Sequence, residues 1–337
     1  MSVDLWTSAA FHAEARAWVS DALRPLGLTP TGEVEQPHAR TWSSALRFAT
    51  TAGEAVWLKV NGIGTRHEPA LLEVLADQVP HLAPDLLAVD LERGWSLTRD
   101  AGPTLRAALA AEDSWPVWER LLVRYADAQL TLADHGDAVR AAGVDDLSPA
   151  RLPAVLRSLL DDLASRPVES GGLAGDDTAA LRRLLPAYDA WCAELAAAPV
   201  PDSVQHDDLH SANVCLPAHA PARVIDWGDA SWGCPLATML TTMRSLAFHA
   251  GLFVAGQPVV APQVLRARDA YLEPFTAYAS RADLLRWVGL AGRIGCVSKA
   301  VSYRRALDGA GLEAHAALEF PVRAWLLDLL TGGSPES

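Results

Sequence analysis

The sequence predicts an α+β fold in which a small antiparallel sheet is followed by a large, mainly helical region. Strand-like runs are concentrated between residues 30 and 100, and almost every later segment has helical periodicity. The length of 337 residues is sufficient for two lobes. We therefore expect an N-terminal lobe over residues 1–100 and a C-terminal lobe over residues 101–337.

Composition limits the functional classes. Half of the residues are hydrophobic and a fifth are charged, which indicates a globular protein. The net charge of −13 argues against nucleic-acid binding, since such proteins present basic surfaces. It is compatible with a cationic ligand, because an acidic cleft attracts cations, and it would equally serve solubility alone.

No feature of the sequence indicates export or a membrane span. The first residues contain early acids and form an amphipathic pattern, and the four cysteines have no CxxC spacing. The weakly charged stretch 234–261 contains Arg244 and His249 and is interrupted by glycines and a proline, which favours a buried helix and loop. We expect a cytoplasmic protein with free thiols and no membrane partner.

The N-terminal elements follow from local patterns. Apolar residues at helical spacing predict a helix over 7–24, and residues 30–61 change to strand character. The runs TWSSALRFATT and EAVWLKVNG form a hairpin around Ala52-Gly53. A helix over 67–78 then precedes a second strand pair at 86–90 and 94–100. This order predicts an antiparallel sheet with one helix packed on it.

The rest of the chain is predicted to be helical, apart from two short strand-like pieces around residues 205–226. The Gly- and Pro-rich segment 166–176 is predicted to be a loop between helices. The predicted helices cover residues 104–112, 115–137, 150–165, 176–198, 235–249, 262–279, 281–305 and 311–331.

The segments QHDDLHSANV (205–214) and VIDWGDAS (224–231) contain the groups that metal-dependent phosphoryl transfer requires. Asp208 can accept the proton of an attacking hydroxyl. Asn213 and Asp226 can hold Mg²⁺ against nucleotide phosphates, because this ion prefers hard oxygen ligands. The short apolar runs beside them predict a loop, strand, turn and strand that bring Asn213 and Asp226 together.

The order His206-x-Asp208-x₄-Asn213, followed by Asp226-Trp227-Gly228, resembles the aminoglycoside phosphotransferase and choline kinase superfamily over about residues 40–245. These enzymes are small-molecule relatives of the protein kinases, so the resemblance implies a kinase-like two-lobe fold and the use of ATP. It implies that Asp208 is the catalytic base and that Asn213 and Asp226 are the Mg²⁺ ligands. It also implies that His206 braces the catalytic loop.

Lys59 is the candidate phosphate-binding lysine of the N-terminal lobe. In the strand VWLKV it alternates with apolar residues and lies on the opposite face from them. In the following helix, Glu68 falls on the apolar inner face, whereas Glu73 does not. A buried carboxylate requires a cation, and the resemblance implies that the lysine on the strand pairs with this glutamate.

The remaining nucleotide contacts are less distinctive in sequence. The turn before the second strand lacks a Gly-x-Gly motif, but Ser43 and Ser44 are small enough to let backbone N–H groups approach phosphates. Residues Thr98 to Asp100 leave the sheet where the resembled family receives adenine. Their continuation to Thr104 is also compatible with a turn and a helix N-cap.

Several residues near the motif depart from the family pattern or have open roles. Asp207 replaces a common Gly, and either binds a substrate amine, raises the pKa of a neighbouring acid or faces solvent. His210 and Asp229 are either substrate-side or structural. Thr238 stands where many relatives have an Asp that braces the loop.

The resemblance therefore implies an ATP- and Mg²⁺-dependent O-phosphotransferase acting on a hydroxyl of a small, polar and possibly cationic metabolite. Some relatives phosphorylate amino sugars, so an amino sugar or aminoglycoside is the expected acceptor. The alternative is a catalytically silent, kinase-like nucleotide-binding protein. Oligomeric state is left open. The candidates for the acceptor pocket are Trp287, Tyr303, Glu319, Trp325 and the acids near residues 207–229. The acids Asp207, Asp208, Asp226 and Asp229 exceed what one base and one metal ligand require, and this surplus is the reason to expect an amine on the acceptor.

Overall fold

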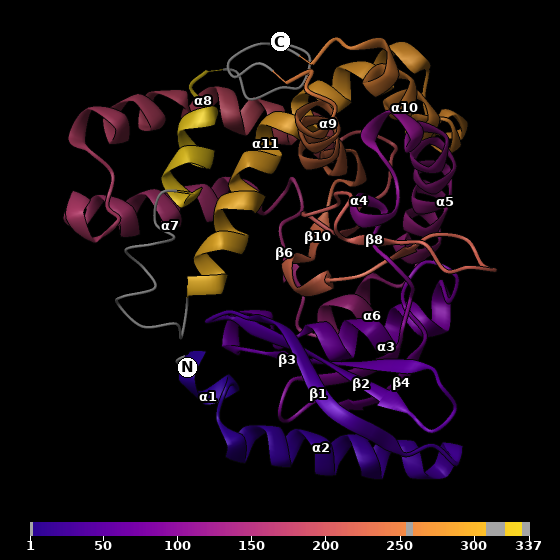
Figure 1. The fold of residues 1–337 in the computed structure, drawn as a ribbon. Helices are drawn as coiled ribbons and strands as arrows, with labels where there is room; N and C mark the ends of the chain where they lie inside the picture. The colour runs from indigo at the N-terminus through magenta and orange to yellow at the C-terminus, as the bar shows by residue number, and fades with distance from the viewer. Residues whose placement is uncertain (1–2, 254–258, 308–320, 332–337) are drawn as a thin grey trace.

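The computed structural model describes residues 3–253, 259–307 and 321–331. It has the predicted α+β, two-lobe architecture, with a five-stranded antiparallel sheet at one end and a helical lobe at the other (Figure 1). The strand order is β1-β2-β3-β5-β4. The sheet comprises β1 (Pro30–Ala39), β2 (Ser43–Thr50), β3 (Ala55–Asn61), β4 (Leu86–Asp90) and β5 (Trp95–Arg99).

The two faces of the sheet have different neighbours. Helix α2 (Ala9–Leu23), which follows the short α1 (Val3–Trp6), packs on the outer face against apolar residues of β2 and β3 (Figure 1). Because side chains alternate along a strand, Lys59 of β3 lies on the other face, level with Ala45 of β2. Helix α3 (Glu68–Gln78) lies between the sheet and the helical lobe.

Most of the helices predicted for the second lobe are present in the structure. The helices of this lobe are α4 (Leu105–Ala108), α5 (Trp115–Ala133), α6 (Gly136–Ala141), α7 (Leu152–Ala164), α8 (Gly175–Ala196), α9 (Thr238–His249), α10 (Pro262–Leu272) and α11 (Arg281–Leu307). Residues 321–328 are also helical. The beginning of the predicted helix 311–331, with Glu319, lies outside the described residues.

Three predicted helices were too long. The segment 104–112 contains only the four-residue α4 and a 3₁₀ turn, and 115–137 divides into α5 and α6. The segment 262–279 ends as an α-helix at Leu272, because Pro274 cannot continue the hydrogen-bond ladder, and a 3₁₀ turn follows. Proline alone does not end every helix, since Pro186 lies inside α8.

The prediction of only two short strands in this lobe was wrong. Strands β8 (Val214–Cys215) and β9 (Arg223–Val224) form the expected hairpin, and β7 (Ser203–Gln205) leads into the catalytic motif. Two further strands, β6 (Asp145–Asp146) and β10 (Ser231–Gly233), join β7 in a small sheet. Beyond the hairpin, the Ile225 amide donates to the Asn213 carbonyl over 2.9 Å, which brings the two halves of the motif together.

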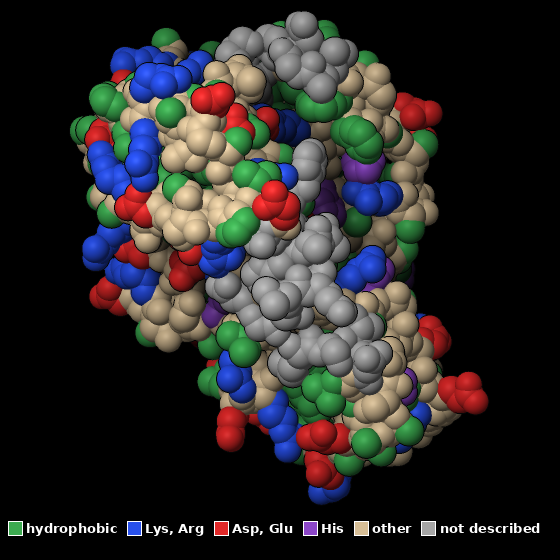
Figure 2. Space-filling model, turned by 90° about the vertical axis from the view of Figure 1, so that its left-hand side faces the viewer, with side chains coloured by type: hydrophobic (Ala, Val, Ile, Leu, Met, Phe, Trp, Pro, Cys, Tyr) green, Lys and Arg blue, Asp and Glu red, His purple; other side chains and the backbone are tan. Residues whose placement is uncertain are grey.

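The four cysteines are buried and free, as predicted. Within the described ranges, no helix combines the length and apolar character needed to cross a membrane. Acidic and basic side chains are interspersed on the face shown in Figure 2, so the net charge of −13 is not gathered into a single patch there. The boundary between the two lobes, predicted to follow residue 100, stays a prediction.

Candidate active site

His206 holds the loop that carries Asp208 from within the core. Its backbone amide donates to the Tyr125 hydroxyl over 3.0 Å, and its Nε2 is 2.8 Å from the Ile225 carbonyl. The imidazole also packs against the Trp227 indole, with 4.7 Å between ring centroids. Burial lowers the pKa of His206 to about 4, so the ring is neutral at pH 7. These contacts join the loop before β8 to the segment after β9.

Asp208 lies at the centre of a set of donors. One carboxylate oxygen is 3.3 Å from Lys299 Nζ, and the other is 3.2 Å from His210 Nε2 and 3.4 Å from Asn213 Nδ2. Burial acts to raise the pKa of Asp208, but Lys299 and His210 outweigh it and hold the pKa well below its usual range. Asp208 is therefore an oriented carboxylate that can position a hydroxyl and receive its proton.

Asp207 does not face solvent, so that alternative is wrong. Its side chain is buried and accepts a hydrogen bond from the Ser231 hydroxyl. Its φ of 60° lies in the left-handed region, which favours glycine. Burial raises the pKa of Asp207 to about 6. The carboxyl helps to shape the loop from behind and is not presented to a ligand.

Hydroxyl groups of α9 support the loop where an aspartate was expected. Thr238 Oγ1 donates to the Gln205 side chain over 2.7 Å. Thr241 Oγ1 donates to the Asp207 carbonyl over 3.1 Å, and Thr242 Oγ1 to the Leu209 carbonyl over 3.2 Å. One face of α9 thus braces the backbone on both sides of Asp208.

Lys59 connects the sheet to the second half of the motif. Its ammonium is 2.6 Å from Glu68 Oε2 and also pairs with Asp226. Glu68 is only 1% exposed, and its other oxygen accepts the Trp227 amide over 2.8 Å. Burial alone would lower the pKa of Lys59, but Asp226 and Glu68 outweigh it and raise the pKa. The lysine therefore remains an ammonium between two carboxylates.

Asn213 and Asp226 have the donor chemistry that a magnesium ion requires. The Asn213 amide donates to the Asp208 carbonyl over 3.0 Å, which fixes this side chain. Asp226 adopts a left-handed φ of 65°, and its side chain is 55% exposed. In the described part of the chain, no three His, Cys, Asp or Glu residues form a metal cluster. This sparse oxygen set fits Mg²⁺, which is usually held by one or two protein ligands together with substrate phosphates and water.

The predicted phosphate and adenine contacts lie in and after β2 and β5. Ser43 shares the Lys59 face of the sheet, whereas Ser44 faces α2, where its hydroxyl donates to the His38 carbonyl over 2.8 Å. Any contact of Ser44 with phosphate would have to use its backbone. Thr98 lies opposite Trp57, one residue before the end of β5, and the Asp100 carboxylate accepts the Gly102 amide over 2.9 Å. Asp100 thus closes a turn, one of the two interpretations that the sequence allows.

Lys299 was not predicted to belong to the site. It comes from α11, and its Nζ lies 3.3 Å from Asp208 and 3.7 Å from Asp229. The ammonium also lies 5.3 Å from the Tyr303 ring centroid, which connects one acceptor candidate to the site. No sequence motif surrounds Lys299, but one feature of the sequence could have identified it as a site residue. Of the 28 Lys and Arg residues, only Lys59 and Lys299 are lysines.

The end of α11 is fixed to the segment that follows Asp226. Arg305 forms an ion pair with Asp145 at 2.8 Å, and its guanidinium donates to the Gly228 and Ala230 carbonyls at 3.3 Å. The helix that carries Lys299 is therefore anchored one and a half turns further on, at the segment after Asp226. The other candidate tryptophans, Trp287 and Trp325, pack at the edge of the helical core.

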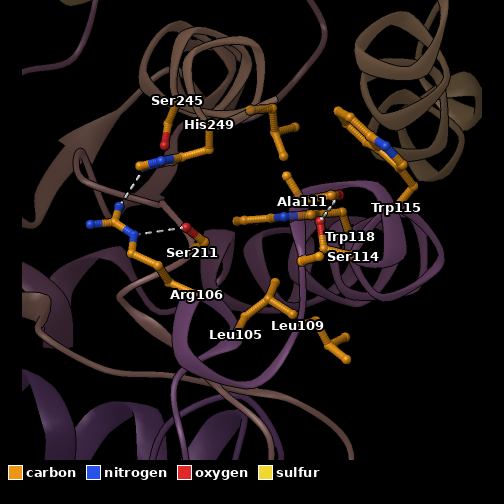
Figure 3. Close-up of a pocket in the computed structure, with 12 residues that line it drawn as sticks. Leu105, Arg106, Leu109, Ala111, Ser114, Trp115, Trp118, Ser211, Ser245 and His249 are labelled. Atoms are coloured by element: carbon orange, nitrogen blue, oxygen red, sulfur yellow. Dashed lines mark hydrogen bonds between the residues drawn. The ribbon is translucent and has the colours of Figure 1, made fainter. Parts of the chain in front are cut away.

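A cavity of about 250 Å³ borders the catalytic loop on the side of α4, α5 and α9 (Figure 3). Arg106 donates to the Ser211 hydroxyl over 3.2 Å, and its guanidinium is 2.6 Å from His249 Nε2. The Trp115 indole lies on the far side of the cavity from Arg106, and the Trp118 indole extends across the middle of the view (Figure 3). The lining contains no acid, and none of its residues was predicted as part of the site.

Comparison with known proteins identifies both the fold and a family match. A family model described as "Phosphotransferase enzyme family" matches residues 35–284. No match was found among curated proteins. A solved "Macrolide 2'-phosphotransferase type I" has 15% identity and a TM-score of 0.56, with 96% of this chain and 98% of that chain covered.

Two other solved structures have the same fold. A choline/ethanolamine kinase family protein from Mesorhizobium loti has 17% identity and a TM-score of 0.58, with coverage of 95% of this chain and 97% of that chain. The GDP and kanamycin complex of an APH(2″) protein has 15% identity and a TM-score of 0.54, with coverage of 91% and 98% respectively.

Proposed function

Because the chain belongs to the phosphotransferase enzyme family, we propose that it is an ATP- and Mg²⁺-dependent O-phosphotransferase acting on a hydroxyl of a small polar metabolite. One observation carries this proposal. Lys59 from the sheet pairs with Asp226, and Asp208 from the helical lobe lies near enough to Asp226 to act on the pKa of its carboxyl group. Phosphoryl transfer requires this combination of a phosphate-binding cation, metal-binding oxygens and an oriented base.

Each residue then has a defined task. Asp208 orients the acceptor hydroxyl toward the γ-phosphate and receives its proton as the new P–O bond forms, while the bond from the γ-phosphorus to the bridging oxygen breaks and ADP leaves with that oxygen. Lys59, fixed by Glu68, offsets negative charge on the nucleotide phosphates. Asn213 and Asp226 would hold Mg²⁺, which supplies charge neutralisation for the transferred group. Thr98 to Asp100 and the backbone at Ser43 and Ser44 are the proposed nucleotide contacts.

Amino sugars and aminoglycosides are the proposed acceptors to test first. This choice is supported by the solved relative that contains kanamycin and by the choline/ethanolamine kinase family relative. The acidic residues of the motif do not support an acceptor with an amine, because each of them already has a partner. Asp207 is hydrogen-bonded to Ser231, Asp226 pairs with Lys59, and Asp208 and Asp229 both face Lys299.

The decisive experiment measures ADP release from ATP and Mg²⁺ across a panel of sugars, amino sugars and aminoglycosides. On any acceptor found, Asp208→Asn should lower kcat by about 10²–10⁴-fold while the affinity for nucleotide stays within a few-fold. Wild-type activity in Asp208→Asn would show that another group is the base. Tight ATP binding without turnover of any acceptor would favour the silent nucleotide-binding alternative.

A further inference from the structure

The chain uses lysine only at its phosphoryl-transfer centre. Every cationic side chain apart from Lys59 and Lys299 is an arginine or a histidine. Both lysines contact carboxylates of the catalytic motif, although they lie 240 positions apart in the sequence and come from different lobes. The proposed reaction gives Lys59 a role at the nucleotide phosphates, whereas it leaves Lys299 without one.

Lys299 is a buried ammonium shared between two carboxylates. The residue is 2% exposed, and its Nζ faces Asp208 at 3.3 Å and Asp229 at 3.7 Å. Tyr303 closes one side of the ammonium with its ring. A buried ammonium is unfavourable unless it is paired, and two neighbouring carboxylates are unfavourable without a cation. The three groups therefore form one ion-paired unit, in which the Lys299 ammonium offsets one of the two carboxylate charges.

The geometry favours lysine over arginine at this position. An ammonium is a compact point charge that can donate to two carboxylates lying in different planes, whereas a guanidinium is a planar fork suited to one carboxylate. An arginine here would also need more space beside Tyr303. Arg305, one and a half turns later in α11, instead binds Asp145 and two carbonyls, so it cannot replace Lys299 at Asp208.

We propose that Lys299 is a specificity-determining residue that occupies the position of a substrate amine. Its ammonium supplies the positive charge that Asp208 and Asp229 would otherwise take from a ligand. A cationic acceptor group brought beside Asp208 would meet a like charge. The site therefore selects an acceptor that is uncharged next to its reacting hydroxyl, such as a neutral polyol or a sugar whose amine lies elsewhere. This inference rests on the proposed phosphotransferase function.

Chemical rescue tests whether a small cation can take the place of the Lys299 ammonium, and the measurement requires neither nucleotide nor acceptor. Lys299→Ala leaves a space equal to n-propylammonium, so this cation should raise the melting temperature of the variant at constant ionic strength. It should leave the wild type unchanged, and neutral n-propanol should have no such effect on either protein. Arg244→Ala is the matched control, because it removes a partly buried cation from the Asp328 carboxylate elsewhere in the lobe. Equal stabilisation of wild type and Lys299→Ala, or of neither, would overturn the proposal.

Acceptor choice provides the second test, and it applies even if Lys299→Ala does not fold. Glucose and glucosamine differ by an amine beside a hydroxyl, and Lys299→Met keeps most of the side-chain volume without the charge. The wild type should not prefer glucosamine, and Lys299→Met should shift the kcat/KM ratio toward glucosamine by about tenfold or more, as expected for close charge pairs.

A tenfold preference of the wild type for glucosamine, or an unchanged ratio in Lys299→Met, would contradict the proposal. If neither protein phosphorylates any acceptor, the proposed function is at fault, and the n-propylammonium titration still decides the role of Lys299. Lys299→Arg separates charge from shape. It retains the charge, so we expect it to keep the wild-type acceptor ratio while losing kcat.

Discussion

At the scale of the residue, the site shows how burial and pairing divide similar carboxylates into different roles. Asp207 and Asp208 are neighbours, yet burial raises the pKa of the first to about 6, whereas Lys299 and His210 hold the pKa of the second low. The loop achieves this with a left-handed φ at Asp207, which turns consecutive side chains toward different surroundings. One is a structural acid and the other a permanently ionised carboxylate.

Asp207 should make the protein more stable in mild acid. Its folded pKa of about 6 lies above the unfolded value of 3.8, so the folded state binds more protons between these two values. The contribution of Asp207 is therefore present below about pH 4 and is lost as the pH rises to about 6, by an amount on the order of 3 kcal/mol. Urea unfolding of wild type and Asp207→Asn between pH 4 and 7 measures it.

The difference in unfolding free energy between the two proteins is the relevant quantity, because Asp202, whose pKa is also raised to about 6, titrates in both. Parallel pH profiles of wild type and Asp207→Asn would show that Asp207 is ionised in the folded protein throughout this range.

At the scale of the element, α3 and the β8–β9 hairpin place side chains that would otherwise be far apart. Helix α3 presents Glu68 on the same face as Leu71, Leu72 and Leu75, so the carboxylate is buried together with the apolar stripe. From there it holds both the Lys59 ammonium and the Trp227 amide. The helix thus sets the distance between the sheet and the segment around Asp226.

Glu68→Gln should weaken both stability and nucleotide binding. It leaves the Lys59 ammonium with only Asp226 and removes a buried charge partner, which costs about 3 kcal/mol when a buried pair is broken. The expected result is a lower urea midpoint and a weaker affinity for ATP, measured by calorimetry. Glu73→Gln is the matched control, because this glutamate lies on the exposed face of the same helix. Equal effects of the two substitutions would argue against a special role for Glu68.

Asp226, which follows the β8–β9 hairpin, leads to a separate prediction about magnesium binding. Asp226→Ala removes a hard oxygen ligand and should abolish the tightening of ATP binding that Mg²⁺ produces in the wild type. The measurement is ATP affinity with Mg²⁺ and with EDTA. Asp226→Asn keeps an oxygen and should retain part of the effect. An undiminished Mg²⁺ effect in Asp226→Ala would place the metal elsewhere.

At the scale of the whole molecule, α11 connects the two lobes. Its end packs against the turn between β3 and α3, where a Cβ built at Gly64 would lie 1.9 Å from the Arg305 carbonyl. The same helix carries Lys299 to Asp208. The packing of the lobes and the chemistry of the site therefore depend on the same element.

Gly64→Ala should disturb this contact and destabilise the protein by about 2 kcal/mol, since backbone must move to admit the methyl group. The control is Gly175→Ala, because nothing lies within 4 Å of a Cβ at that position. Thermal unfolding of the two variants measures the difference. A melting temperature of Gly64→Ala equal to that of Gly175→Ala would mean that stability does not depend on the close contact between Gly64 and the Arg305 carbonyl.

The sequence by itself determined the α+β class, the sheet followed by helices, and the motif with Asp208, Asn213 and Asp226. These features depend on local periodicity and on short spacings, which a single chain displays directly. The spacing within the motif also implied the meeting of Asn213 and Asp226, because a short hairpin leaves few alternatives.

Only the tertiary structure decided which charges meet across long separations. The contact of Lys299 with Asp208, the bracing of the loop by Thr241 and Thr242, and the burial of Asp207 each join segments 24 to 91 positions apart. Such pairs leave no periodic or local pattern in one sequence, because they arise when helices pack on a loop. The same packing turned an apparent surplus of acids into paired groups.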